Sequence, residues 1–271
     1  MDTFNTIVEF LNDFVFYVQM KWNQTNRFLR ALFLVLVFEL QIYPTRKLGF
    51  RCNDSSLSYP FYGDTISWKW LLAVCSLAPL LVMLIVEQVC QDKEKARKRS
   101  LRWFREYMFG YLVNLAFVQF LKTMMGCPRP HFFHTCLPKE ALTCKESEFV
   151  TKYTCTKTNS DWLYQSDRSF PSGHTSLAVH SALFIIYYLH RRVPNAAHSI
   201  IVKILQTITL AVAVWCGVSR IMDRRHHKGD VMVGALIGFA VLVYTTHTLC
   251  NKFKCRSDPP TNDDEGEIPL E

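Results

Sequence analysis

Three short clusters of residues suited to phosphate chemistry stand at the ends of long apolar stretches of this chain. The clusters occupy residues 122–130, 171–174 and 219–230. They contain lysine, arginine, histidine, serine and glycine. Ammonium and guanidinium groups bind phosphate oxygens, and a helix N-terminus offers free N–H groups to an anion. These residue types together predict a site that handles a phosphate group at a membrane surface.

The first two clusters supply cations and backbone donors. Lys122 closes an apolar stretch, and Arg129 follows seven residues later between two prolines that stiffen the chain. Ser172 is a favoured N-cap residue, and Gly173 lets the backbone approach a ligand closely. His174 then stands at the rim of the site. Taken alone, the lysine could instead extend to the membrane interface and the tetrapeptide could be an ordinary cap.

The third cluster contains a histidine and a carboxylate four residues apart. On a helix, His226 and Asp230 would lie on one face. A carboxylate bonded to one ring nitrogen fixes the tautomer and leaves the other nitrogen nucleophilic. We therefore predict His226 as the nucleophile and Asp230 as its orienting residue. His227, only three residues from Asp230, ranks second, and a purely structural pair is the alternative.

The apolar stretches that carry the clusters are long enough to cross a membrane. The chain has 271 residues, of which 49% are hydrophobic, and about 20 apolar residues span a bilayer. Candidate spans are roughly 28–44, 68–90, 107–125, 173–190, 199–218 and 230–250. The predicted fold is an all-α integral membrane protein with six transmembrane helices in one bundle, residues 23–250. Residues 1–22 are expected to form an amphipathic interfacial helix or a helix on the bundle, and 251–271 a disordered acidic tail.

Charge predicts the orientation in the membrane. Seven basic residues between Lys93 and Arg105 mark the segment 91–107 as cytoplasmic. Alternation then places both termini inside and all three clusters on the outer or lumenal face. The glycosylation sequon at Asn53 falls outside, whereas the one at Asn23 falls inside and should be unused. The net charge of +8 fits anionic lipid and a phosphate site rather than nucleic acid.

Cysteine placement predicts an oxidised outer region. Five cysteines fall in the predicted outer loops: Cys52, Cys127, Cys136, Cys144 and Cys155. A disulfide among the last three is expected, with its pairing left open. The chain has no Cys-x-x-Cys pair and no carboxylate cluster beside the phosphate-friendly residues. We therefore expect no metal and no cofactor.

With all three clusters in view, the chain resembles the type 2 phosphatidic acid phosphatase superfamily. That family's pattern is Lys-x6-Arg-Pro, then Pro-Ser-Gly-His, then Ser-Arg-x5-His-x3-Asp, and every position is filled here. The first outer loop, with Arg51-Cys52-Asn53-Asp54 and Asp64-Thr65-Ile66, is similar to that of animal lipid phosphate phosphatases, including the wunen-type proteins of insects. The resemblance implies the same six-span architecture.

The resemblance also implies a reaction, namely metal-independent hydrolysis of lipid phosphate monoesters through a phosphohistidine. His226 would attack phosphorus, Asp230 would orient it, and His174 would protonate the leaving alcohol and then activate water. The residues implied to hold the phosphoryl oxygens are Lys122, Arg129, Ser172, Gly173, Arg220 and Ser219. The implied substrates are phosphatidate, lysophosphatidate, ceramide 1-phosphate and sphingosine 1-phosphate.

Other functions remain open at this stage. A member of the same superfamily could act on polyisoprenyl diphosphates or sugar phosphates, and a non-enzymatic anion transporter could use the same outer cations. The expected location is the plasma membrane or an endomembrane, with membrane lipids as surroundings. A homo-oligomer is expected only by analogy with the family.

Overall fold

The computed structural model describes residues 27–90, 93–157, 162–193 and 199–253. Three sequence predictions therefore lie wholly or mostly outside the described residues. They concern the amphipathic helix 1–22, the unused sequon at Asn23 and the acidic tail 251–271.

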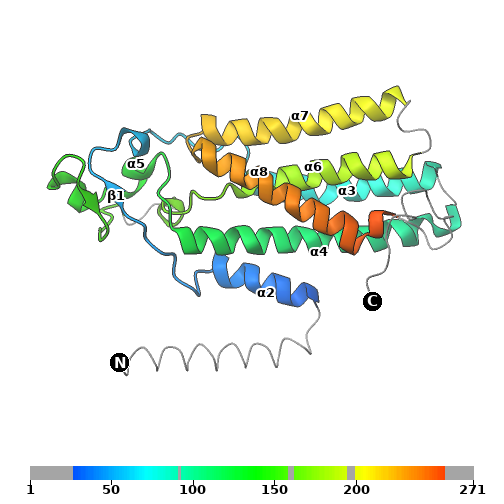
Figure 1. Ribbon diagram of the computed structural model, residues 1–271, viewed down its shortest axis with the longest axis horizontal. Coiled ribbons are helices and arrows are strands. Elements are labelled where there is room, and N and C mark those ends of the chain that lie inside the picture. Colours follow the sequence, from blue (N-terminus) through cyan, green and yellow to red (C-terminus); the bar gives the residue numbers. More distant parts are fainter. Residues whose placement is uncertain (1–26, 91–92, 158–161, 194–198, 254–271) are drawn as a thin grey trace, which may run out of the picture.

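Long helices run side by side along the molecule and form a bundle (Figure 1). The helices are α2 (Arg27–Glu39), α3 (Trp68–Cys90), α4 (Lys93–Met125), α6 (Gly173–Arg192), α7 (Ile200–Met222) and α8 (Lys228–Val243), and a π-helical turn (Tyr244–Leu249) continues α8. Helix α6 packs against α3, α4, α7 and α8. Its central position explains why many of its side chains are buried.

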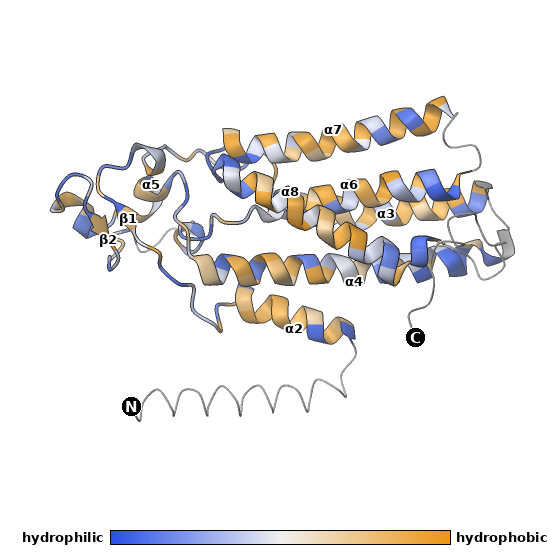
Figure 2. Cartoon of the chain, viewed as in Figure 1, coloured by the Kyte–Doolittle hydropathy of each residue, from blue (hydrophilic) through white to orange (hydrophobic). Residues whose placement is uncertain are grey.

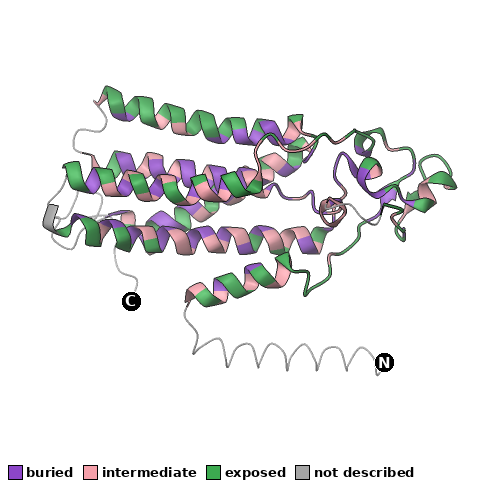
Figure 3. Cartoon of the chain, turned by 180° about the vertical axis from the view of Figure 1, so that it is seen from behind, coloured by how far each residue is buried: buried purple, intermediate pink, exposed green. Residues whose placement is uncertain are grey.

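Helices α3, α4, α7 and α8 are each long and apolar enough to cross a membrane. Their outward faces carry exposed apolar side chains such as Trp70, Ile201 and Met232. Figure 2 shows that apolar residues run along the helices of the bundle. Figure 3 shows the molecule from behind, and there most of α7, the uppermost helix, is coloured as exposed. Soluble proteins rarely expose apolar area on this scale. The chain is therefore an integral membrane protein, and the count of six spans stays a prediction.

Helix α4 corrects one boundary of the sequence analysis. The segment 91–107 was expected to be a loop, but α4 begins at Lys93 and runs for 33 residues. Lysine, arginine and glutamate are strong helix formers, so the helix continues beyond the apolar stretch. At about 1.5 Å per residue it is roughly 50 Å long, which exceeds the ~30 Å apolar core of a bilayer. Its basic first turns therefore extend past the membrane interior.

The loops at one end of the bundle fold into a small cap. Strand β1 (Phe50–Arg51) pairs antiparallel with β2 (Phe149–Val150), a small sheet that the all-α prediction did not include. The short helices of this region are α5 (Phe132–Cys136) and 3-10 turns at Ser55–Leu57, Lys139–Leu142 and Leu163–Gln165. The rings of Phe50, Phe132 and Tyr153 pack together beneath them. The cap thus has an aromatic core of its own.

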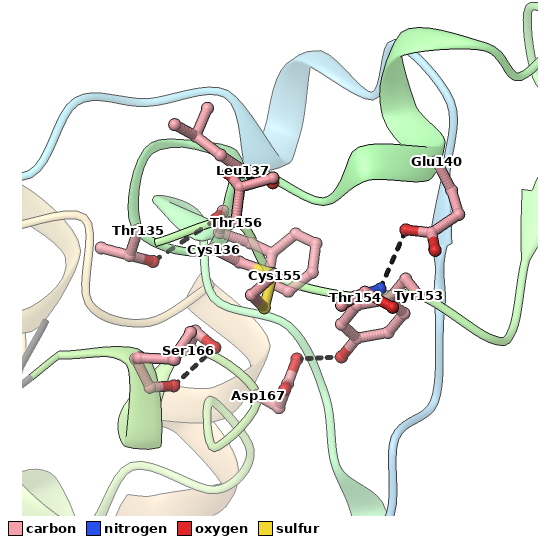
Figure 4. The surroundings of a disulfide bond; sticks show 12 residues. Thr135, Cys136, Leu137, Glu140, Tyr153, Thr154, Cys155, Thr156, Ser166 and Asp167 are labelled. Carbon is pink, nitrogen blue, oxygen red and sulfur yellow. Dashed lines mark hydrogen bonds between the residues drawn. A yellow bond between two sulfur atoms is a disulfide. The ribbon is translucent and has the colours of Figure 1, made fainter. Parts of the chain in front are cut away.

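Two disulfides close the cap. Cys136 pairs with Cys155, as one of the expected combinations, whereas Cys144 pairs with Cys52 from the first outer loop. The sequence analysis missed the second pair because 92 residues separate its members. Beside the Cys136–Cys155 bridge, the hydroxyl of Tyr153 donates a hydrogen bond of 2.6 Å to Asp167 (Figure 4). The cap is therefore tied to the segment that leads into α6.

Candidate active site

The three predicted clusters meet at the cap end of the bundle. The C-terminal ends of α4 and α7 and the N-terminal ends of α6 and α8 lie there together (Figure 1). Backbone hydrogen bonds join the clusters directly. The N–H of Ser172 donates to the carbonyl of Asp230 at 2.9 Å, and the N–H of Ser169 donates to that of Cys127 at 3.0 Å. Residues far apart in sequence thus form one rigid site.

His226 is buried in the turn between α7 and α8. Its Nδ1 lies 2.6 Å from the carbonyl oxygen of Ser169. A carbonyl oxygen can only accept, so Nδ1 carries the hydrogen and Nε2 keeps a free lone pair. Burial, together with the charges of Arg129 and Lys122, holds the pKa of His226 well below its usual range. The imidazole is therefore neutral at physiological pH, the form that a nucleophile needs.

Asp230 contacts His226 indirectly, and not through the shared helical turn that the sequence predicted. His226 precedes α8, so the two residues do not share a helical turn, and Oδ2 of Asp230 is 3.8 Å from Nδ1. The same oxygen instead accepts hydrogen bonds from the Ser169 hydroxyl at 2.6 Å and from the His227 N–H at 2.9 Å. Ser169 thus links the carboxylate to the imidazole. Because the carbonyl that holds His226 is backbone, its role leaves no sequence signal.

Ser172, Gly173 and His174 open α6. Ser172 is the N-cap, and its side chain accepts from the N–H of Thr175, as its residue type predicts. A Cβ at Gly173 would lie 3.2 Å from the Val118 side chain and 3.8 Å from the Lys122 ammonium, so glycine keeps this contact open. His174 places its Nε2 3.2 Å from the carbonyl oxygen of Ile66, in the first outer loop. Each histidine therefore has one ring nitrogen held by a backbone carbonyl.

Arg129 is buried and bonded to uncharged acceptors. Its Nε donates to the Gln165 carbonyl at 2.7 Å, and its Nη2 to the Arg168 carbonyl at 3.1 Å. Lys122 has no ion-pair or hydrogen-bond partner for its ammonium among the described residues. Buried charges are normally paired. Arg129 and the partly buried Lys122, two of the three cations predicted to bind phosphate, thus keep a charge that an anionic ligand would neutralise.

Arg220 is also buried, but carboxylates surround it. Its Nη1 donates to Asp64 at 3.1 Å and its Nη2 to Asp223 at 2.9 Å. Its Nε donates to the hydroxyl of Ser219 at 3.2 Å, and that hydroxyl donates in turn to the Cys216 carbonyl. Ser219, a predicted phosphate ligand, therefore positions Arg220 in this structure.

Two further buried arginines belong to the same group and were not among the predicted site residues. Arg168 donates to the side chain of Gln119 at 2.9 Å, and Arg225 lies over the adjacent rings of Phe61 and Trp162. A signal existed for each. Arg168 comes four residues before Ser172, and Arg225 belongs to a short outer loop unusually rich in basic residues.

A cavity of about 260 Å³ lies between α2, α3, α4 and α6. Its polar end is lined by five basic residues, Lys122, Arg129, Arg168, His174 and Arg225, together with the carboxylate Glu39 and the uncharged Gln119, Tyr164, Gln165 and Gly173. Its apolar end is lined by Val35, Trp68, Leu71, Leu72, Leu115, Val118 and Leu177. His226 and Arg220 do not line this cavity. The cavity thus has a mainly cationic end and an apolar end, the arrangement expected of a site that binds an anionic head group attached to an apolar chain.

Comparison with known proteins identifies the family of this site. The sequence profile of the PAP2 superfamily matches residues 103–254, which contain all three clusters. The chain belongs to the PAP2 superfamily. The match covers more than half of the chain and leaves out the first outer loop, from which Asp64 and Ile66 contact the site.

The curated relatives of this PAP2 protein place it in the lipid phosphate phosphatase branch. It is 32% identical over 239 residues to a probable diacylglycerol pyrophosphate phosphatase 1 from Schizosaccharomyces pombe, which covers 83% of this chain and 81% of the relative. It is 28% identical to mouse phospholipid phosphatase 2, with 81% and 82% covered. A putative phosphatidate phosphatase from Drosophila melanogaster is 30% identical over 77% of this chain, which spans 62% of that relative's length. No solved structure gives a significant match.

Proposed function

We propose that this PAP2 protein hydrolyses lipid phosphate monoesters, without a metal ion, through a phosphohistidine at His226. Its family and the names of its relatives support a lipid phosphatase. The observation that carries the mechanism is the hydrogen bond from His226 Nδ1 to the Ser169 carbonyl. It leaves Nε2 unprotonated beside a group of buried cations that could bind a phosphate.

In the first step, the lone pair of His226 Nε2 forms a bond to phosphorus, and the bond from phosphorus to the lipid oxygen breaks. The Ile66 carbonyl accepts a hydrogen bond from the Nε2 proton of His174, so the general acid of this step is the doubly protonated His174 imidazolium, whose second proton passes from Nδ1 to the departing alcohol oxygen and leaves a neutral imidazole. The products of this step are a neutral lipid alcohol and a phosphorylated, positively charged imidazole. The nearby Asp230 carboxylate stabilises that charge.

In the second step, His174 Nδ1 takes a proton from water as the water oxygen bonds to phosphorus. The phosphorus–Nε2 bond breaks, inorganic phosphate leaves, and both histidines return to their starting states. Lys122, Arg129 and Arg220 balance the charge of the phosphoryl oxygens throughout, and the backbone N–H of Gly173 is available at the start of α6. These fixed donors supply what a metal ion would otherwise contribute.

The cavity supports a lipid substrate. Its apolar end lies between helices of the bundle, directly beside the cationic end. A lipid phosphate could therefore place its head group against the cations while its chain remains among apolar side chains. We extend the proposal to phosphatidate, lysophosphatidate, ceramide 1-phosphate and sphingosine 1-phosphate, and to a six-span protein whose site faces the outside or a lumen in the plasma membrane or an endomembrane.

A second candidate is a lipid diphosphate. Arg168 and Arg225 add two buried cations to those of the family pattern at the same cavity. A second phosphoryl group would use that extra charge. The Schizosaccharomyces relative is named for a pyrophosphate substrate.

Phosphate release by the purified protein in detergent and excess EDTA would test both candidates. The panel would contain the four monoesters, diacylglycerol pyrophosphate, a polyisoprenyl diphosphate and a sugar phosphate. We expect release from the lipid phosphates and none from the His226→Ala variant. Activity that EDTA abolishes and magnesium or zinc restores would contradict the metal-independent mechanism. Activity on the sugar phosphate alone would contradict the lipid substrate.

A further inference from the structure

A three-residue segment of the first outer loop contacts the site from outside the part of the chain that matches the family. It consists of Asp64, Thr65 and Ile66, which we name the 64–66 strap. The strap precedes α3, whereas every cluster of the family pattern lies after residue 121. It nevertheless reaches both the third cluster and His174.

Each residue of the strap makes a defined contact. One oxygen of Asp64 accepts a hydrogen bond from Arg220 Nη1 at 3.1 Å and forms an ion pair with Arg225 Nε, also at 3.1 Å. The N–H and hydroxyl of Thr65 donate to the two oxygens of Asp223 at 2.8 and 2.6 Å. The carbonyl of Ile66 lies 3.2 Å from His174 Nε2. The strap therefore joins two arginines to the proposed general acid.

The hydrogen bonds of Arg220 show what Asp64 contributes. A guanidinium has five N–H groups. Those on Nε and Nη2 are used by Ser219 and Asp223, and one of the two on Nη1 is used by Asp64. Within the described residues, the second Nη1 hydrogen is left for a ligand. Because the two Nη1 hydrogens are fixed relative to each other, the bond to Asp64 sets the direction of the remaining one.

Charge supports the same role. Arg129, Arg220 and Arg225 are all buried, and the guanidinium groups of Arg220 and Arg225 both lie 3.1 Å from the same oxygen of Asp64. Cations this close repel one another. The Asp64 carboxylate lies between Arg220 and Arg225, and its side chain is itself only 11% exposed. It therefore offsets the repulsion while it fixes both guanidinium groups.

We propose that Asp64 is a positioning residue of the phosphoryl site: it aims Arg220 and Arg225 at the phosphoryl group, and the strap couples them to His174 through Ile66. The inference rests on the proposed function, because it assumes that Arg220 binds a phosphoryl group. It adds a residue that the family pattern does not contain.

The test compares Asp64→Asn with Asp54→Gln. Both replace an aspartate of the first outer loop by a neutral amide, but the Asp54 side chain only caps the turn at Ser55–Leu57. Glutamine is used at position 54 because asparagine there would create a new glycosylation sequon with Ser55 and Ser56. Vanadate, a phosphate-like anion, is the probe. We expect Asp64→Asn to lower kcat/KM by about 10- to 100-fold, the size of effect that a displaced binding group produces. The same variant should show a smaller increase in melting temperature when vanadate is added. Asp54→Gln should behave as the unaltered protein.

Two additional variants separate positioning from folding. Thr65→Val removes only the hydroxyl bond to Asp223, so it should fold and lower kcat/KM by a smaller factor. Asp64→Glu keeps the charge and should recover part of the activity lost in Asp64→Asn. If folded Asp64→Asn protein keeps full vanadate protection and full kcat/KM, the inference is wrong. If Asp64→Asn does not fold, unchanged values in Thr65→Val overturn it.

Failure of the proposed function would look different. In that case the unaltered protein would release no phosphate from any lipid phosphate, whereas the vanadate comparison among the variants could still be made. Suppose that the protein has no phosphatase activity but vanadate still stabilises it in a way that depends on Asp64. That result would support the anion site and contradict the proposed reaction.

Discussion

Two groups of buried charges lie at opposite ends of the bundle, and they are built in opposite ways. At the end away from the cap, a fully buried carboxylate, Glu87, is the centre. It accepts hydrogen bonds from Arg99 at 2.8 Å, Arg192 at 3.0 Å and the hydroxyl of Tyr188 at 2.9 Å. At the cap end, the cations are the centre and the carboxylates stand around them.

The difference shows which charges hold the fold and which are left for a ligand. Glu87 joins the ends of α3, α4 and α6, and its two oxygens have partners within the chain. In the cap-end group, by contrast, the acceptors that Arg129 meets among the described residues are all uncharged, and none of these residues pairs with the Lys122 ammonium. A buried cation without a counter-ion is costly. A bound phosphoryl group would offset that cost.

The largest effect is expected at His226. His226→Ala removes the proposed nucleophile, so turnover of lipid phosphate should fall by at least about 10⁴-fold. His227→Ala is the matched control, because its backbone N–H to Asp230 remains. Phosphate release by both folded variants measures the difference. An active His226→Ala protein beside an inactive His227→Ala protein would reverse the assignment of the nucleophile.

His174→Ala should reduce turnover less, by about 10²–10⁴-fold, the usual contribution of a general acid or base. A substrate with a good leaving group needs no protonation, so transfer of its phosphoryl group to His226 should be less affected. Rapid-quench measurement of the phosphorylated protein with a good and a poor leaving group separates the two steps. Equal losses for both leaving groups would argue against a general acid at His174.

Glu87→Gln should affect stability and leave catalysis unchanged. It leaves two arginines beside a neutral amide, and breaking a buried charge pair typically costs about 3–5 kcal/mol. Thermal unfolding in detergent would measure the loss, and activity per folded molecule should equal that of the unaltered protein. A folded Glu87→Gln protein with impaired kcat would show that the two ends are coupled, contrary to the comparison above.

The sequence predicted the members of the cap-end group better than their contacts. Residue type and spacing identified His174, His226 and Asp230, and membrane-length apolar runs identified the helices. The link through Ser169 was not predictable, because it depends on a backbone carbonyl and on a turn between α7 and α8. The four-residue spacing suggested a shared helical turn, but α8 begins only at Lys228.

Long-range contacts were likewise missed. The pairing of Cys52 with Cys144 and the bonds of Asp64 to Arg220 and Arg225 join residues far apart in sequence. Helical periodicity carries no information on such pairs. The extension of α4 into a basic segment was missed for another reason, since apolar length was taken as helix length although charged residues also favour helix.

Acid should destabilise the cap end. His131 is buried beside Arg129 and Arg225, and burial together with these charges lowers its pKa to about 3. The unfolded chain, with a histidine pKa of about 6.5, then binds more protons than the folded chain below that pH. Stability is therefore full above about pH 6.5 and falls toward pH 3, by up to about 1.4 kcal/mol per pH unit from this residue. A plot of melting temperature against pH should have a shallower slope for His131→Gln than for the unaltered protein.

The smallest expected effect is a change in apparent mass at Asn53, and it tests which side of the membrane holds the cap-end group. Asn53 is exposed in the cap, two residues after β1. If the cap is lumenal, Asn53 should carry a glycan, and Asn53→Gln should lower the apparent mass as much as enzymatic deglycosylation does, with activity unchanged. Asn23→Gln should not change the mass. If Asn23→Gln lowers the apparent mass instead, the topology is inverted. The cationic group would then lie in the cytosol and Glu87 on the outer side.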